Sequence, residues 1–242
     1  MSSPESKTQS GSDRIDHARP SLIEARGVCR RVPVKTDWLL RDISLTLSGG
    51  DRIALTGPAG SGKTLLLRAL AQLDPIEAGH VLWRGQSLVP AAIPAYRSQV
   101  TYLHQRSTLL AGTVEENLHW PFTLRVFRAR QFDRGRVLDF LAVVGRDASF
   151  LDKSDRDLSG GERQIVALLR AVQLDPVVLL LDEPTSALDK DTRTAVESLV
   201  DDWQRQLPQQ RAYLWVTHDA EQATRVGQRI GSMRGGQLIT ER

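Results

Sequence analysis

The sequence has very little cysteine, and this scarcity limits the chemistry that it can support. Cys29 is its single cysteine among 242 residues, so the chain cannot form an internal disulfide or a cysteine-rich metal site. This fits a reducing compartment, and we expect Cys29 to be a small buried residue. Aromatic residues make up only 5% of the chain, and the basic residues do not cluster with them, so no nucleic-acid partner is predicted.

Long apolar runs are also missing. No stretch approaches the roughly 18 apolar residues that a membrane-spanning helix needs. Residues 1–20 lack the apolar core of a signal peptide and are rich in serine with balanced charges, so we expect them to form a disordered tail. Residues 21–242 have the composition of one globular domain, in a chain that is 40% hydrophobic and 25% charged. The small net charge of +3 suits a position near an anionic membrane surface.

A phosphate-binding loop is present. The segment from Gly57 to Thr64 reads GPAGSGKT and satisfies G-x-x-x-x-G-K-[ST], between a short apolar strand (52–56) and an apolar helix from about Thr64 to Leu73. In such loops backbone N–H groups and the positive end of the helix dipole converge on a polyphosphate. We expect Lys63 to reach the β- and γ-phosphates, because a turn that binds nothing would give it no evident structural role. The predicted nucleotide-binding residues are Gly57, Pro58, Ala59, Gly60, Ser61, Gly62, Lys63 and Thr64.

An acidic pair follows a second predicted strand. Val177 to Leu181 are five apolar residues without alternation, which is typical of a parallel strand buried on both faces. Asp182 at its carboxyl end is placed to hold Mg²⁺ through water, and Glu183 is placed to orient or deprotonate an attacking water. Two carboxylates at a strand end can also be merely solvated, but the phosphate loop favours the catalytic interpretation.

A third motif, LSGGERQ, begins at Leu158. Ser159 is a good helix N-cap and Glu162 completes a capping box, so a well-capped helix to about Gln173 accounts for part of it. Gly160 and Gly161 are costly in a first helical turn unless something must approach the backbone closely. A γ-phosphate presented by another subunit would be such a ligand. Since the chain holds one set of these motifs, we predict a dimer in which Ser159, Gly160 and Gly161 complete the partner's site.

The order of these three motifs resembles that of the ATP-binding cassette (ABC) ATPases, over about Leu22 to Ile239. The resemblance implies an α/β fold: a P-loop NTPase (RecA-like) core with an N-terminal antiparallel β lobe and an inserted helical lobe. It also implies an ATPase that uses ATP and Mg²⁺ and acts as the ATP-binding subunit of an ABC transporter. Its partners would be a second copy, giving a homodimer around two ATP, and a separate multi-span membrane permease. The implied location is cytoplasmic, peripheral on the inner face of the cell membrane.

The resemblance assigns further roles. Gln105 matches the glutamine loop that senses Mg²⁺ and the γ-phosphate, and His218 matches the histidine that contacts the γ-phosphate. Ser186 to Asp189 match the loop that crosses the dimer interface. The catalytic residues expected on this basis are Glu183, His218, Lys63 and Gln105, and the metal-binding residues are Thr64, Gln105 and Asp182. The other histidines, His17, His80, His104 and His119, are expected to be solvent-facing or structural.

The spacing of apolar residues divides the domain into a helical part and parts rich in strands. Helix-like spacing between Ser107 and Asp157 predicts the helical lobe over about 107–157, while residues 22–56 and a hairpin turn at 234–237 predict strands. The apolar segment 109–122 is the expected permease-binding surface. The alternative is that its Leu, Trp and Phe residues fill the core of the helical lobe.

The sequence departs from the family pattern at two positions, and it resembles one branch of the family more than the others. Many relatives stack adenine on an aromatic residue, but that position falls at or near Val32, with Trp38 the nearest aromatic. Ile165 stands where typical members have Arg. The chain looks most like the iron-efflux ATPase subunits of the FetA type, which would make the cargo iron or another metal recognised by the permease. The alternatives are other branches of the transporter family, a soluble ABC ATPase, and a regulatory ATP-binding module not tied to transport.

Overall fold

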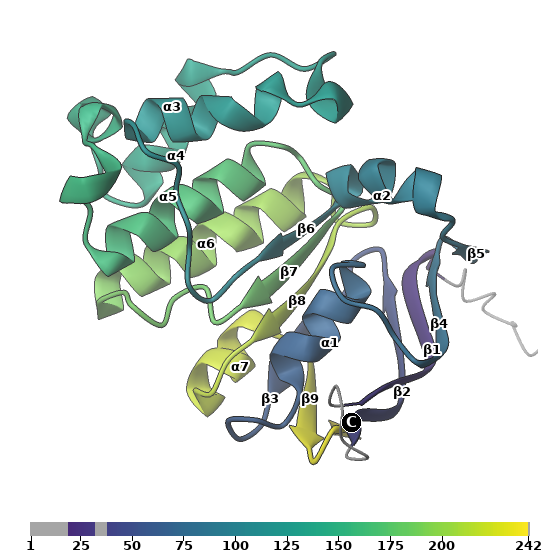
Figure 1. The fold of residues 1–242 in the computed structure, drawn as a ribbon. Coiled ribbons are helices and arrows are strands. Elements are labelled where there is room, and N and C mark those ends of the chain that lie inside the picture. The colour runs from purple at the N-terminus through teal and green to yellow at the C-terminus, as the bar shows by residue number, and fades with distance from the viewer. Residues whose placement is uncertain (1–18, 32–37, 242) are drawn as a thin grey trace, which may run out of the picture.

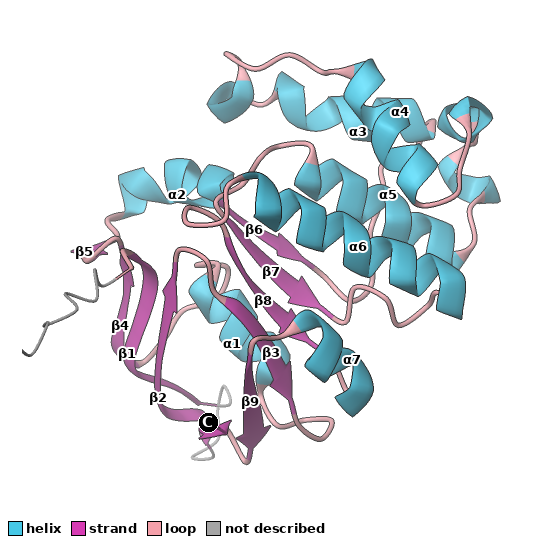
Figure 2. Ribbon diagram, turned by 180° about the vertical axis from the view of Figure 1, so that it is seen from behind, coloured by secondary structure: helices cyan, strands magenta, loops and turns pink. Residues whose placement is uncertain are grey.

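The structure is a computed structural model that describes residues 19–31 and 38–241. Most of the predicted tail, 1–20, therefore lies outside the described residues, as do His17 and Val32. The described part contains two β-sheets and a set of helices, which Figures 1 and 2 show from opposite sides.

The smaller sheet is antiparallel and forms the N-terminal lobe. Its strand order is β2-β1-β4-β5, and β1 pairs antiparallel with both β2 and β4. In β2, Ile43 and Leu47 are buried while Ser44 and Thr46 between them are exposed, as the alternation predicts. The strands are β1 (Ser21–Arg31), β2 (Trp38–Ser48), β4 (Ala78–Trp83) and β5 (Gln86–Ser87).

The larger sheet has six strands in the order β10-β9-β3-β8-β7-β6. Neighbouring strands from β9 to β6 pair in parallel, and β10 returns antiparallel to β9 through the turn at 234–237, which confirms the predicted hairpin. The strands are β3 (Arg52–Thr56), β6 (Val100–Leu103), β7 (Val178–Asp182), β8 (Ala212–Val216), β9 (Arg229–Arg234) and β10 (Gln237–Glu241).

Each face of this sheet packs into its own hydrophobic core. In β7, Leu179 and Leu181 join a core built with the carboxyl-terminal helices and the helical lobe. Val178 and Leu180 join the other core, which contains the first helix and the antiparallel sheet. This placement explains why β7 is apolar at consecutive positions, because side chains of alternate residues point to opposite faces that are both covered.

Helices pack on both faces of the larger sheet and at the end of β6 (Figure 2). They are α1 (Lys63–Leu70), α2 (Ile93–Gln99), α5 (Gly160–Val172), α6 (Lys190–Gln206) and α7 (Ala220–Val226), and a 3₁₀ helix (Pro90–Ala92) precedes α2. The predicted end of the first helix at Leu73 is wrong. Gln72 adopts a left-handed φ of 56°, and the Leu73 N–H donates to the carbonyl of Arg68, so the chain turns off in a Schellman-type cap and leaves Leu73 exposed.

The segment between the sheet's β6 and α5 carries the helical lobe. Asp133 caps α4 and Thr113 caps α3 with a capping box completed by Glu116. Val114 and Leu118 are fully buried in the core that this lobe shares with α5. The helices are α3 (Val114–His119) and α4 (Arg134–Val143), with 3₁₀ helices at Trp120–Thr123, Arg125–Phe127, Ala148–Asp152 and Asp155–Asp157.

One smaller expectation fails. Cys29 is only half-buried, and its Sγ accepts a hydrogen bond from the N–H of Asp42 at 3.2 Å. Ile165, which stands where typical members have Arg, is 1% exposed and packs in the core. An apolar residue there follows from burial. Within the described ranges, no helix is long and apolar enough to cross a bilayer.

Candidate nucleotide-binding and catalytic site

The phosphate loop connects β3 to α1 at the carboxyl edge of the parallel sheet, where ligands of such sheets bind. Two of its glycines are required by geometry. Gly57 has a φ of 137° and Gly62 a φ of 104°, and a Cβ on Gly57 would lie 2.3 Å from the carbonyl oxygen of Met233. Gly62 is also the N-cap of α1 and provides no side-chain hydrogen bond. The first N–H groups of α1 thus have no side-chain cap and suit an anion.

Lys63 contributes to this loop structurally, contrary to expectation. It is 7% exposed, and its Nζ donates to the carbonyl oxygens of Gly57 at 2.8 Å and Pro58 at 3.0 Å. An ammonium group has three donors, so one remains for a phosphate oxygen. The hydroxyl of Ser61 is buried and has no hydrogen-bond partner, which fits a loop built to receive an oxygen-rich ligand.

Asp182 ends β7 and is 2% exposed. The hydroxyl of Tyr102, on the adjacent strand β6, donates to its Oδ2 at 3.0 Å. Burial and the nearby Asp182 charge raise the pKa of Tyr102, so this hydroxyl keeps its proton and remains a donor. Tyr102 was not predicted as a site residue, although its position three residues before Gln105 on the strand beside β7 was a usable signal.

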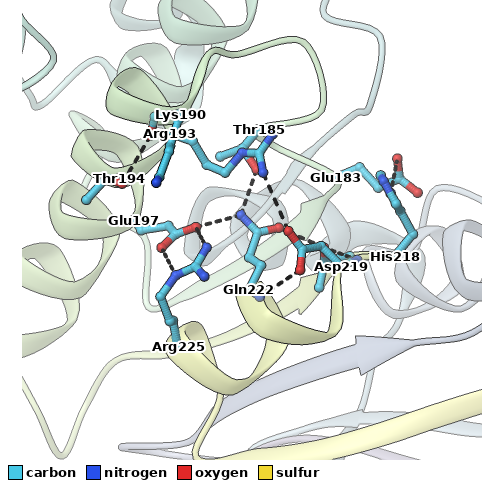
Figure 3. A network of polar contacts seen from close by, with 11 residues as sticks. Glu183, Thr185, Lys190, Arg193, Thr194, Glu197, His218, Asp219, Gln222 and Arg225 are labelled. Atoms are coloured by element: carbon cyan, nitrogen blue, oxygen red, sulfur yellow. Dashed lines mark hydrogen bonds and ion pairs between the residues drawn. The ribbon is translucent and has the colours of Figure 1, made fainter.

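Glu183 brings together two of the predicted residues. Its Oε2 accepts a hydrogen bond from Gln105 Nε2 at 2.9 Å, and His218 Nδ1 lies 3.6 Å from the same oxygen; Figure 3 shows Glu183 beside His218. These residues follow the carboxyl ends of β6, β7 and β8. Glu183 has a φ of 47°, a left-handed conformation that costs energy in a non-glycine residue and clusters at functional sites.

Gln164 is a second residue that sequence reasoning missed. Its Nε2 donates to the backbone carbonyl of Glu183 at 2.8 Å, and its Oε1 accepts from the N–H of Ala187 at 3.2 Å. The amide is 3% exposed. It therefore joins α5 to the turn that carries Glu183, using both sides of one side chain.

The LSGG motif forms the start of α5. Ser159 and Glu162 make the predicted capping box, which is confirmed. Hydrogen bonds from Lys153 and from the Ser159 N–H lower the pKa of Glu162 to about 2. The two glycines differ: a Cβ on Gly161 would lie 2.8 Å from the carbonyl oxygen of Ala187, whereas Gly160 has open space. The close approach at Gly161 is thus satisfied within the chain, and only Gly160 keeps the argument for an external ligand.

Ser159 and Gly160 are exposed. Among the described residues, no hydrogen bond joins this motif to the phosphate loop. The structure therefore brings Gln105, Asp182, Glu183 and His218 to one sheet edge with the phosphate loop, and leaves the LSGG motif on a separate exposed surface.

The oxygen donors at this edge fit Mg²⁺, which prefers hydroxyl, carboxylate and carbonyl oxygens. Tyr102 occupies one carboxylate oxygen of Asp182, and Gln105 uses its amide nitrogen toward Glu183. The second carboxylate oxygen, the amide oxygen of Gln105 and the hydroxyl of Thr64 are the donors left. Within the part of the chain that is described, His, Cys, Asp and Glu form no group of three or more that could hold a metal ion.

Comparison with known proteins decides the family. The family model described as "ABC transporter" matches residues 40–186, which include the phosphate loop, Gln105, the LSGG motif and the acidic pair. The chain belongs to the ABC transporter family. It is an ATP-binding, ATP-hydrolysing cassette of this family, and the α/β fold class predicted from the sequence is confirmed.

The similar proteins differ in what their names say they move. The chain is 39% identical to the "Probable iron export ATP-binding protein FetA" of Escherichia coli (strain K12) over 76% of this chain and 80% of that protein. It is 36% identical to the "Sulfate/thiosulfate import ATP-binding protein CysA" of Bordetella parapertussis over 89% of this chain. The match spans only 60% of the length of that CysA protein.

Solved structures of ABC cassettes share the fold. One is a dimeric ATP-binding cassette in a post-hydrolysis state bound to ADP and Pi, with a TM-score of 0.78 at 25% identity. The alignment covers 91% of this chain and 97% of that structure.

Proposed function

We propose that this ABC cassette is the ATP-hydrolysing motor subunit of a transporter, closing as a homodimer around two ATP and driving a separate membrane permease. The observation that carries the proposal is the meeting of Gln105, Asp182, Glu183 and His218 at the sheet edge that also holds the phosphate loop. The loop binds the polyphosphate, and the acidic pair and histidine act on the γ-phosphate. The chain would work in the cytoplasm, at the inner face of the cell membrane.

Each residue has a distinct role in this proposal. Lys63 lies by the β- and γ-phosphates and places its free donor on one of their oxygens, and Thr64, Gln105 and Asp182 would hold Mg²⁺, which would supply charge neutralisation on the phosphates. Tyr102 keeps Asp182 in place. Glu183 orients the attacking water and accepts its proton, and His218 stabilises charge on the γ-phosphate. No covalent intermediate is needed, because phosphoryl transfer depends on positioning and electrostatics.

The exposed LSGG motif supports the dimer. Ser159 and Gly160 present a helix N-terminus at the surface, and the ATP on the partner supplies an anion that suits it. Ser186 and Ala187 are exposed on the loop before α6, where they would lie at the same interface. The dimeric state of the similar solved cassette supports this arrangement.

A groove beside Gln105 is the proposed permease-binding surface. It has a volume of about 640 Å³ and lies between β6, α5 and the helical lobe. Of the predicted apolar segment 109–122, Leu110 and Trp120 are 43% and 44% exposed and line the groove, whereas Val114 and Leu118 fill the lobe's core. Arg106 and Arg170 line the groove and no carboxylate does, so an apolar helix with acidic residues is the complementary partner.

For the cargo, we propose metal export, with recognition by the permease. The name of the FetA relative supports export of iron, and the names of the CysA relatives support the competing assignment, sulfate import. Co-expression with the permease in inverted membrane vesicles separates the two: ATP-dependent uptake of Fe²⁺ supports export, and sulfate movement in the opposite direction supports import.

The dimer is tested on Glu183→Gln, which keeps the shape of the side chain but cannot accept a proton. Light scattering after size-exclusion chromatography, with and without Mg-ATP, should show conversion of monomer to dimer with ATP and no phosphate release. A protein that stays monomeric at saturating ATP, both alone and with the permease, would contradict the shared-site proposal.

The groove is tested by Leu110→Ser, with Leu207→Ser as a matched control. Both leucines are exposed, at 43% and 40%, but Leu207 lies at the end of α6, away from the groove residues. Co-purification with the permease should fall only for Leu110→Ser. Equal loss, or no loss, in both variants would argue against the groove.

A further inference from the structure

One buried amide links the loop that carries His218 to the loop that carries Glu183. Gln222, on α7, is 3% exposed. Its Oε1 accepts from the hydroxyl of Thr217 at 2.7 Å, and its Nε2 donates to Thr185 Oγ1 at 2.8 Å. Thr217 directly precedes His218, and Thr185 follows Glu183 by two residues. Figure 3 shows Gln222 near Thr185 and Asp219.

Asp219, the other neighbour of His218, is the N-cap of α7 and belongs to the same set of hydrogen bonds. The backbone N–H of Gln222 donates to Asp219 Oδ1 at 3.0 Å, and the Asp219 N–H donates to Thr217 Oγ1 at 3.1 Å. The Thr217 hydroxyl therefore accepts from Asp219 and donates to Gln222, which determines the direction of each bond in this set. The Gln222 side chain therefore holds Thr217 directly, whereas the bond to Asp219 comes from the backbone of residue 222 and does not depend on the side chain there.

The position of His218 depends on this backbone, because its side chain has little else to hold it. The side chain is 72% exposed, and its Nδ1 lies 3.6 Å from Glu183 Oε2, beyond good hydrogen-bond distance. Displacement of a reacting group by about 1 Å can cost roughly a hundredfold in rate. A side chain that sets the two loops relative to each other thus bears directly on the reaction.

The amide is required at this position by a neighbouring carboxylate. Gln222 Nε2 also donates to Glu197 Oε1 at 2.7 Å, and Glu197 is paired with Arg225. The Glu197 carboxylate can only accept, so it requires an N–H donor from residue 222 while residue 197 is ionised, whereas the Thr185 hydroxyl can either accept or donate. A glutamate here would place a second carboxylate against Glu197, where like charges repel at short range.

We propose that Gln222 is a positioning residue that sets His218 relative to Glu183 for ATP hydrolysis, acting through Thr217 and Thr185. This inference rests on the proposed catalytic roles of His218 and Glu183. None of the Gln222 hydrogen bonds reaches residues 57–64. Loss of Gln222 therefore lowers kcat and leaves ATP binding intact.

The test is a double-mutant cycle at positions 222 and 197, with steady-state phosphate release from the full chain and equilibrium binding of radiolabelled ATP. Gln222→Glu should lower kcat by about tenfold to a hundredfold, with ATP affinity within about twofold of the wild type. The kcat of Glu197→Gln alone should stay within about threefold of the wild-type value, because an amide oxygen can still accept from Gln222. In the double variant the amide and the carboxylate exchange places, and kcat should recover to within about threefold.

Recovery distinguishes positioning from a general loss of stability. Gln228→Glu, at an exposed glutamine, controls for the added charge and should match the wild type. If Gln222→Glu does not fold, Gln222→Met replaces it in the comparison, with the same loss of kcat expected.

Two results would overturn the inference: unchanged kcat in Gln222→Glu, or a double variant no better than the single one. His218→Ala and Glu183→Gln are measured in parallel. Full turnover in either of these would defeat the proposed catalytic roles, whereas loss in both with normal Gln222→Glu would defeat only the role of Gln222.

Discussion

Gln105 Nε2 donates to Glu183 Oε2 at 2.9 Å, across the carboxyl ends of two adjacent strands, β6 and β7. The bond orients the carboxylate that we assign as general base. It also joins that carboxylate to the segment that leads into the helical lobe and the groove. Movement of the segment after β6 would therefore be transmitted to Glu183 through this bond.

Gln105→Ala should lower kcat at least tenfold, because Glu183 loses its orienting donor and Mg²⁺ loses a proposed ligand. ATP binding without Mg²⁺ should stay within about twofold of wild type, because the phosphate loop is untouched. Phosphate-release and ATP-binding assays on the same preparations check both parts. Equal losses of kcat and of metal-free ATP affinity would contradict the assigned role.

Lys63→Ala should abolish ATP binding and ATP-dependent dimerisation together. The substitution removes the donor meant for the phosphates, and it also leaves the carbonyl oxygens of Gly57 and Pro58 without their partner. The loop itself is therefore expected to loosen, which distinguishes this variant from a pure loss of charge. Calorimetric titration with ATP measures binding, and a measurable affinity close to wild type would contradict the prediction.

Gly160→Ala and Gly161→Ala form a matched pair within the LSGG motif. A Cβ on Gly161 would lie 2.8 Å from the Ala187 carbonyl oxygen, whereas one on Gly160 meets nothing within 4 Å. Gly161→Ala should destabilise the chain by about 1–3 kcal/mol through overpacking. Gly160→Ala should keep or raise stability by about 0.5–1 kcal/mol, since alanine favours a helix.

Gly160→Ala and Gly161→Ala together distinguish an effect on the stability of the fold from an effect on dimerisation. In the Glu183→Gln background, Gly160→Ala should still block the ATP-dependent dimer, because in the proposed dimer the added methyl group would face the partner's phosphate. Urea unfolding and light scattering measure the two effects. A Gly160→Ala variant that dimerises normally would show that no ligand approaches this backbone.

The residues that could be predicted from the sequence share one property: each belongs to a short local motif whose spacing indicates its chemistry. Gly57 to Thr64, the acidic pair and the capping box at Ser159 belong to this class. Tyr102, Gln164 and Gln222 do not, because a buried Tyr or Gln is informative only once its partners are known. Those partners come from distant parts of the chain: Asp182 for Tyr102, Ala187 for Gln164, and Thr185 for Gln222.

The errors have a similar origin. The helix from Lys63 was extended to Leu73 because apolar spacing continues, but a left-handed Gln72 ends it. Lys63 was given no structural role because its carbonyl partners appear only when the loop is folded. For Gly161, the carbonyl oxygen of Ala187 gives a reason for glycine within the chain that only the folded structure reveals, and its contact with a partner's nucleotide stays a prediction.

Trp38 is the nearest aromatic residue to the position, at or near Val32, where many relatives stack adenine. It is half-buried at the start of β2, and the guanidinium of Arg31 lies 4.1 Å from its ring centroid, so one face is already covered. If adenine stacks on the other face, Trp38→Ala should weaken ATP binding by about 1–3 kcal/mol, the usual value of base stacking. Trp38→Phe should retain most of the affinity, and Arg31→Ala should have the smaller effect. Equal ATP affinity in Trp38→Ala and wild type would contradict a stacking role.

The capping box at the start of α5 gives the chain a predictable response to acid. Donation from Lys153, and then from the Ser159 N–H, lowers the pKa of Glu162 from 4.5 to about 2 in the folded protein. A carboxylate whose folded pKa is depressed stabilises the fold above its unfolded pKa and loses that contribution as the pH falls. The contribution is therefore full above about pH 4.5 and disappears toward pH 2.

Glu162→Gln should consequently show a flatter dependence of unfolding free energy on pH. Between pH 6 and pH 3, the wild type should lose about 1–2 kcal/mol more than the variant, an amount typical of a charge-assisted cap. Lys153→Met removes the largest cause of the lowered Glu162 pKa but keeps the Ser159–Glu162 capping box. The stability that this variant loses between pH 6 and pH 3 should therefore lie between the losses of the wild type and of Glu162→Gln. Urea unfolding at each pH measures the effect, and parallel curves for wild type and Glu162→Gln would contradict it. Because Glu162 caps the helix that presents Ser159 and Gly160, the same titration should weaken ATP-dependent dimerisation over the same acid range.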